Sequence, residues 1–191
     1  MMLKLSLLIV FVALLACERN DVMTYKVPKQ TLLVAQLSQN DSLKTINWII
    51  PDAWIKQPDT EFRLASYQVP ALDSSNELGD FSIVKFPGDA GGVLANVNRW
   101  RKQLSLDPIT VDDLVSLLVP VQHSELSISF IQLDNVTKQS SGSSFEAMYV
   151  GFFIANDHSY FFKLTGSKNL LRAYYDNFIT ILRTITYETP K

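Results

Sequence analysis

Residues 145–165 read FEAMYVGFFIANDHSYFFKLT, two segments rich in aromatic residues with a short polar run between them. The segments Phe145–Ala155 and Tyr160–Thr165 have the composition of β-strands. The run between them, NDHS at 156–159, consists of residue types that favour a tight turn. Together these features predict an antiparallel β-hairpin.

Outside this hairpin, other segments carry strand or helix signals. Four more strands are expected, over Ile46–Ile50, Phe62–Val69, Phe81–Phe86 and Leu126–Leu133. Apolar stripes predict two longer helices, over 91–104 and 168–185. A short helix over 111–118 begins with Thr110 and Asp113 at capping-box spacing. The expected fold is α+β: an antiparallel sheet of about six strands flanked by two main helices, an α/β/α sandwich.

The amino terminus has the pattern of an export signal. Lys4 is followed by Leu5–Ala16, an apolar run about a dozen residues long, which is too short to span a bilayer comfortably. The run ends at Cys17, the only cysteine in the chain. Leu14 to Cys17 resembles the lipobox of bacterial lipoproteins, where lipid is transferred to a nucleophilic thiol. The sequence therefore predicts cleavage after Ala16 and a membrane anchor of acyl chains on Cys17.

The lipoprotein resemblance implies a place in the cell envelope. Glu18 follows the cysteine in place of the aspartate associated with inner-membrane retention in enteric bacteria, so an outer membrane, facing the periplasm, is favoured over the inner membrane. An ordinary cleaved signal or an uncleaved anchor is the alternative. The expected organisation is a signal peptide over residues 1–16, a lipidated tether over 17–44 and one globular domain over 45–188, with a disordered tail over 187–191.

Composition narrows the class of partner. Hydrophobic residues make up 47% and charged residues 19% of the chain, as in a globular protein. The formal net charge is −2, and no long basic run offsets it. The chain thus lacks the positive surface that nucleic acid or an anionic bilayer attracts. Membrane attachment must come from the amino terminus.

Residues 86–103, FPGDAGGVLANVNRWRKQ, form a distinctive strand-to-helix junction. Gly88, Gly91 and Gly92 permit positive φ angles and close backbone approach, and Asp89 can accept hydrogen bonds from the first helical N–H groups. A tight turn with a helix cap is the favoured interpretation. An anion site at the helix start is the alternative, although the phosphate-binding fingerprints are missing and Asp89 would repel a phosphate.

The expected helix after this junction is unusually polar. Asparagine is a poor helix former, so Asn96 and Asn98 in one helix need a reason. They bond either to neighbouring loop backbone or to a partner. Trp100 lies on the apolar stripe and is expected in the core. The candidate binding residues are Gly88, Asp89, Gly91, Gly92, Asn96, Asn98, Arg99 and Arg101.

Three motifs carry a resemblance to known proteins. The GDAGG…NVNRWR run, the segment Trp48–Trp54 and the segment Tyr160–Gly166 resemble a group of uncharacterised bacterial lipoproteins and exported proteins. In element order the chain is also similar to PsbP-like domains, the extrinsic photosystem II type, in which an antiparallel sheet packs between helices. Those domains mostly serve as assembly or accessory factors, so the resemblance implies such a role here.

Signs of catalysis are sparse in the sequence. His123 and His158 are the only histidines, and both are expected to be exposed in loops or turns. With Cys17 lipidated there is no cysteine nucleophile and no Cys/His zinc set, and the motifs of serine enzymes are missing. Helix capping explains Asp112 and Asp113 better than a metal does. We therefore expect no enzymatic activity, no cofactor and no metal.

Three functions remain open. The first is a membrane-tethered, non-catalytic module that binds a protein partner in envelope assembly or maintenance. The second is a small-ligand-binding protein or enzyme that uses the loop 88–92 and Arg99. The third is a purely structural lipoprotein. A deep pocket at the loop would favour the second function, and a packed loop with exposed apolar surface would favour the first.

Overall fold

The computed structural model describes residues 45–72, 77–135 and 145–188. The predicted signal peptide (1–16), Cys17 and the tether to residue 44 lie outside the described residues. The strands are β1 (Thr45–Asn47), β2 (Ile55–Lys56), β3 (Ala65–Val69), β4 (Gly79–Pro87), β5 (Val119–Val121), β6 (Ile128–Asp134), β7 (Ala147–Ala155), β8 (His158–Gly166) and β9 (Thr186–Glu188). The helices are α2 (Val93–Gln103), α3 (Val111–Leu117), α4 (Lys168–Ala173) and α5 (Tyr175–Arg183).

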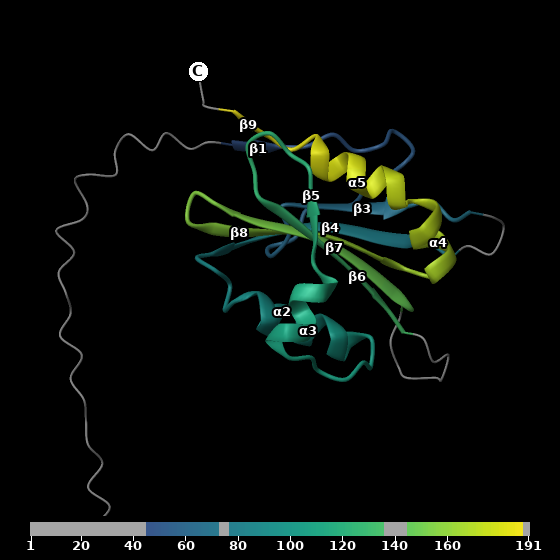
Figure 1. The fold of residues 1–191 in the computed structure, drawn as a ribbon. Coiled ribbons are helices and arrows are strands. Elements are labelled where there is room, and N and C mark those ends of the chain that lie inside the picture. Colours follow the sequence, from purple (N-terminus) through teal and green to yellow (C-terminus); the bar gives the residue numbers. More distant parts are fainter. Residues whose placement is uncertain (1–44, 73–76, 136–144, 189–191) are drawn as a thin grey trace, which may run out of the picture. The chain divides into compact units, whose positions relative to one another are not determined.

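Seven strands form one antiparallel sheet in the order β2-β3-β4-β8-β7-β6-β5 (Figure 1). The predicted hairpin, β7 and β8, lies at its centre and pairs from Ala147–Gly166 to Ala155–His158. β1 and β9 pair with each other in a separate two-stranded sheet. The predicted α+β fold with an antiparallel sheet is confirmed, with seven strands in the sheet where about six were expected.

The central hairpin closes through a two-residue turn. Asn156 and Asp157 have φ angles of 49° and 56°, the left-handed conformation that both central residues of a type I′ turn adopt. His158 and Ser159 already belong to β8. The four-residue turn predicted over 156–159 was therefore too long, because Asn and Asp tolerate this conformation and suffice to reverse the chain.

Near the two ends of the described chain, the structure differs from two of the predictions. The strand expected over 46–50 stops at Asn47, and the Ile49 N–H donates to the Thr184 hydroxyl at 3.2 Å instead of to a strand. Tyr187 and residue 188 belong to β9, so the prediction of a disordered tail was wrong there. Pairing with β1 satisfies backbone groups that a free tail would leave to solvent.

The helix predicted over 168–185 is divided in two. Tyr174 ends α4 and precedes α5, with φ −97° and ψ 13°. Ser167 caps α4 as expected, its hydroxyl accepting from the Leu170 N–H at 3.4 Å. The short third helix also begins as predicted: Thr110 and Asp113 form a complete capping box at α3. The hydrogen bonds from the Thr110 backbone and side chain lower the pKa of Asp113.

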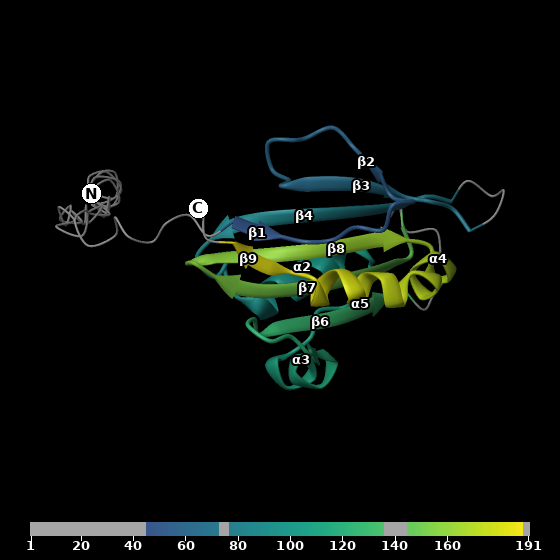
Figure 2. The same cartoon turned by 90° about the horizontal axis from the view of Figure 1, so that it is seen from above.

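The sheet separates two hydrophobic cores, so the fold is a three-layer sandwich. In Figure 1, α4 and α5 lie on one side of the sheet, and α2 and α3 on the other. Figure 2 shows α3 at the β5–β6 end, away from β2 and β3. The first core includes Phe81, Ile83, Tyr149, Phe162, Leu164, Phe178 and Leu182. The second includes Val97, Trp100, Leu104, Leu114, Ile131, Val150 and Phe161.

Glycines in the sheet let α4 and α5 approach it closely. A Cβ on Gly151 of β7 would overlap the side chain of Leu182 on α5. One on Gly79 of β4 would lie 2.9 Å from Leu170 Cδ2 on α4. Both leucines are buried, so the missing Cβ atoms are part of the packing at this interface.

We expect Gly151→Ala to lower the free energy of unfolding by about 1–3 kcal/mol, because the extra methyl overpacks the contact with Leu182. Urea denaturation measures the change. Ile154→Ala on the same strand is the control, since Ile154 is exposed and its truncation is expected to change stability by no more than about 0.5 kcal/mol. An equal loss in both variants would contradict this account of the interface.

Candidate functional site

The predicted glycine loop joins β4 to α2 and is fastened to the central hairpin. Gly88, Gly91 and Gly92 have φ angles of 60°, 84° and 88°, as their positive-φ role predicts. The Gly88 N–H donates to the Asp157 carbonyl at 2.8 Å, and the Ser159 hydroxyl donates to the Gly88 carbonyl at 2.7 Å. The first glycine therefore holds the loop against the type I′ turn.

Asp89 closes the loop and does not cap the helix. Its carboxylate accepts from the Gly91 N–H, and its carbonyl from the Gly92 N–H, each at 3.0 Å. Gly92 is the N-cap residue of α2, and no side chain caps this helix. The predicted capping role of Asp89 was wrong, because its short side chain, three residues before the cap, reaches only the amide two residues ahead.

The two asparagines of α2 bond to neighbouring loop backbone, which was one of the two explanations predicted for them. Asn96 is buried, and its amide donates to the carbonyls of Ala90 at 3.0 Å and Gly92 at 2.8 Å. The Asn96 carbonyl accepts from Arg99 Nη2. Asn98 pairs with both backbone groups of Ile109, at 2.8 and 3.1 Å.

The loop between α2 and α3 is also held by a side chain of α2 that bonds to its backbone. Arg101 Nε donates to the Asp107 carbonyl at 2.6 Å. Trp100 lies in the second core, as predicted, against Phe152 and Phe161. The structure therefore engages Asn96, Asn98 and Arg101 inside the chain, and their role toward a partner stays a prediction.

We expect Asn96→Ala to lower the free energy of unfolding by about 1–3 kcal/mol, because two loop carbonyls lose their donor at a buried position. Gln103→Ala, at an exposed position of the same helix, is the control and should change stability little. Chemical denaturation of both variants distinguishes the two. If the Asn96 variant were as stable as the control, its hydrogen bonds would not hold the loop.

The two histidines are half-buried, where exposed side chains were expected. His123 Nε2 contacts the Ile185 carbonyl at 2.8 Å, and its Nδ1 accepts from the N–H groups of Glu125 and Leu126. His158 Nδ1 contacts the Asn156 carbonyl at 2.6 Å. Both rings bond to local backbone. Among the described residues, no group of three or more His, Cys, Asp or Glu side chains is placed to hold a metal ion.

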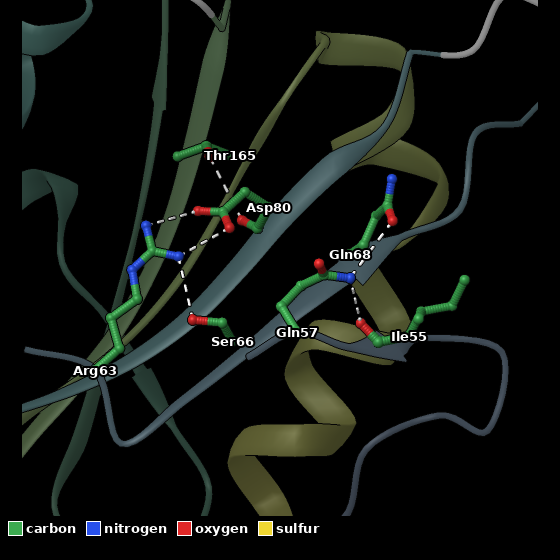
Figure 3. Close-up of polar contacts among 7 residues, drawn as sticks. All are labelled: Ile55, Gln57, Arg63, Ser66, Gln68, Asp80 and Thr165. Carbon is green, nitrogen blue, oxygen red and sulfur yellow. Dashed lines mark hydrogen bonds and ion pairs between the residues drawn. The ribbon is translucent and has the colours of Figure 1, made fainter. Parts of the chain in front are cut away.

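A polar cluster joins side chains of β3, β4 and β8 with Arg63, just before β3 (Figure 3). Arg63 makes a two-pronged ion pair with Asp80, with N–O distances of 2.9 and 3.1 Å, and its Nη1 also donates to the Ser66 hydroxyl at 3.3 Å. The Thr165 hydroxyl donates to the Asp80 carbonyl at 3.4 Å. The cluster continues to the β2 edge, where the Gln57 amide bonds to Ile55 and Gln68.

An open groove of about 410 Å³ lies between α5 and the chain after β1. It is lined by Ile49, Ile50, Pro51, Asp52, Asp176, Asn177, Thr180 and Ile181. One wall of the groove is the segment 49–52, which lies between Trp48 and Trp54. Trp48 packs edge-on against Phe162, and Trp54 is buried against Phe81. Aromatic anchoring on both sides makes this wall a fixed part of the surface.

Neither the polar cluster nor the groove was predicted from the sequence. The signal for the cluster is the alternation of polar residues along strands, as in Asp80 and Ser82 on β4 or Lys163 and Thr165 on β8. The groove has a weaker signal, Trp-Ile-Ile-Pro-Asp-Ala-Trp at 48–54, which predicts a turn but not what packs beside it.

Two solved structures are similar to this chain in fold. A crystal structure from Bacteroides thetaiotaomicron aligns with a TM-score of 0.43 and 11% identity over 76% of this chain, which spans only 45% of that structure. The crystal structure of LpqN, involved in cell envelope biogenesis of Mycobacterium tuberculosis, aligns with a TM-score of 0.44 and 15% identity, over 80% of this chain and 88% of that one. No family model and no curated protein sequence matches the chain. Neither structure tests the resemblance to PsbP-like domains, which stays a prediction.

Proposed function

We propose that this protein is a lipid-anchored envelope lipoprotein whose folded part is a non-catalytic module that binds a protein partner through the groove beside α5. The observation that supports this role is the exposed acidic and apolar groove, together with a glycine loop whose polar groups bond within the chain. The anchor is supported by the sequence around Cys17. Within the described residues, no helix combines the length and apolar character needed to cross a bilayer.

The groove combines two features that a protein partner needs. Of the two isoleucines that line the groove, Ile49 is 68% exposed and Ile181 is buried, so part of the lining is apolar surface open to contact. Asp52 and Asp176 line the same groove and are exposed. No ion pair is found for either carboxylate among the described residues. Charge complementarity favours a partner segment that carries a lysine or arginine next to apolar side chains.

The wall is held in place before any partner arrives. The Ile49 N–H donates to Thr184 Oγ1, which itself donates to the Ile181 carbonyl at 2.8 Å. The Trp54 N–H donates to the Pro51 carbonyl at 2.9 Å and closes the turn. A wall fixed in this way loses little conformational entropy on binding.

The anchor is tested first. We expect a palmitate analogue to label the protein in bacterial cells, and Cys17→Ala to abolish the label, because the lone thiol is the acceptor for the lipid. Gel analysis of the labelled protein and fractionation of the envelope measure both effects. Label retained by Cys17→Ala, or an unlabelled native protein in the aqueous fraction, would exclude the proposed anchor.

The groove is tested by site-specific photo-crosslinking in intact envelopes. A photoreactive residue at Thr180, exposed in the groove, should give a discrete crosslinked protein, and the same residue at Asn169 on α4 is the control outside it. Adding Asp52→Lys and Asp176→Lys should reduce the Thr180 product at least about tenfold, because like charges would then meet.

The crosslinking result has two informative outcomes. A product at Thr180 that the charge reversals remove supports a basic partner segment. A product that forms equally at Asn169, or that survives both reversals, excludes the groove as the docking site. The crosslinked protein is identified by its peptides, and its contact segment should contain lysine or arginine.

A further inference from the structure

Four large apolar side chains are exposed at one end of the seven-stranded sheet. β4 and β7 both end where the β7–β8 turn lies, and β3, which is antiparallel to β4, begins there. The four residues, with their exposed fractions, are Phe62 (73%) and Leu64 (47%) before β3, Phe86 (36%) on β4 and Ile154 (59%) on β7. We call them the apolar rim.

The strand register places two members of the apolar rim in one row across the sheet. Phe86 of β4 pairs with Ser159 of β8, which pairs in turn with Ile154 of β7. Neighbouring strands lie about 4.8 Å apart, so the two apolar side chains begin about 10 Å from each other. The Phe86 ring lies 6.1 Å from that of Phe161, which belongs to the second core. Ile154 lies two residues beyond Phe152 of the same core, so both side chains lie on the α2 face of the sheet.

The segment that carries the other two members is fixed to the sheet. The Leu64 N–H donates to the Ile83 carbonyl of β4 at 2.8 Å. The Arg63 guanidinium pairs with the Asp80 carboxylate at 2.9 and 3.1 Å, so the charge between Phe62 and Leu64 is neutralised. Large apolar side chains that are exposed together on a fixed backbone mark an interaction surface.

The course of the chain indicates what covers this surface. Figures 1 and 2 both show the start of β1, at Thr45, at the same end of the sheet as the β7–β8 turn. Residues 18–44 join Thr45 to Cys17, the proposed site of the lipid anchor. Even fully extended they span no more than about 90 Å, so the anchor keeps the apolar rim within that distance of the bilayer. Contact is then effectively intramolecular, and a small apolar surface suffices for it.

Charge determines which kind of lipid contact is favoured. The formal net charge is −2, and two exposed carboxylates lie near the apolar rim, Asp89 after β4 and Asp157 in the β7–β8 turn. Both oppose attraction to an anionic bilayer. A shallow contact leaves these carboxylates in the hydrated headgroup layer while apolar side chains reach the hydrocarbon boundary. The attraction must therefore come from apolar burial, for which zwitterionic phospholipid is sufficient.

We propose that the apolar rim inserts into the interfacial layer of the same bilayer that holds the protein's lipid anchor. This inference rests on the anchor of the proposed function and adds a second contact, which fixes the orientation of the folded part on the membrane. The groove beside α5 lies on the other side of the sheet from Phe86 and Ile154, so it stays accessible to a protein partner.

The test uses the lipidated protein reconstituted in phosphatidylcholine vesicles. Because Cys17 is the only cysteine and carries the lipid, one introduced thiol at a time can be labelled with a polarity-sensitive fluorophore. With Phe62→Cys and with Ile154→Cys, we expect a blue shift and loss of emission to spin-labelled phosphatidylcholine. Val115→Cys is the matched control, since Val115 is 71% exposed but lies on α3, and its fluorophore should stay in water.

A second comparison tests whether the apolar rim acts as one surface. Adding Phe62→Ser to the labelled Ile154→Cys protein should weaken quenching by the spin-labelled lipid, because apolar contact area is lost. Adding Val111→Ser, at an exposed position of α3, should leave the quenching unchanged. All of these side chains are exposed, so the substitutions should leave the fold intact. Equal quenching in both double variants would contradict a shared surface.

The labelling results separate the apolar rim from the anchor. Quenching at residues 62 and 154 but not at residue 115 supports the proposal. Fluorophores that report water at both rim positions, in protein that floats with the vesicles, would overturn it and leave the anchor intact. A blue shift without quenching by lipid, which grows with the number of proteins per vesicle, would indicate a second copy and would also overturn it. Protein that does not float with the vesicles would contradict the anchor and the proposal together.

Discussion

The pairing of β7 with β8 is the constraint on which the other elements depend. This hairpin presents apolar side chains on both faces, with Tyr149 and Phe162 on one and Val150 and Phe161 on the other. A strand pair that is apolar on both sides must be covered twice. The helices α4 and α5 cover one face and α2 the other, and both are joined to the hairpin or its neighbour by short connections.

Local patterns predicted the elements that this constraint requires. The Asn-Asp turn, the aromatic strands, the Thr110–Asp113 capping box and the stripe with Trp100 are all signals within a few residues. The predicted strand bounds were wrong where a residue distant in the sequence determines whether a strand forms. The β9 strand exists because β1 lies beside it, and the strand expected over 46–50 stops at Asn47 because Thr184 takes the next free N–H.

The candidate site shows the same limit. Positive φ angles at Gly88, Gly91 and Gly92 could be predicted because glycine favours them. The groove could not be predicted in this way, because it is formed by residues near position 50 and others near position 180 that meet only in the folded chain. Asp80 and Arg63 likewise meet only after β3 and β4 pair. Polar residues at alternate strand positions indicate a polar face of the sheet, yet they do not say which charges will lie together across it.

The small β1–β9 sheet has a mechanical consequence. It joins the first described residues to the last over three residue pairs, apart from the seven-stranded sheet. If the chain is tethered through its amino terminus, a pulling force on the tether acts on the folded part at Thr45. It therefore acts on these few hydrogen bonds before any in the large sheet. This ladder would then break before the large sheet does, and its loss would also withdraw Ile46 of β1 from the first core.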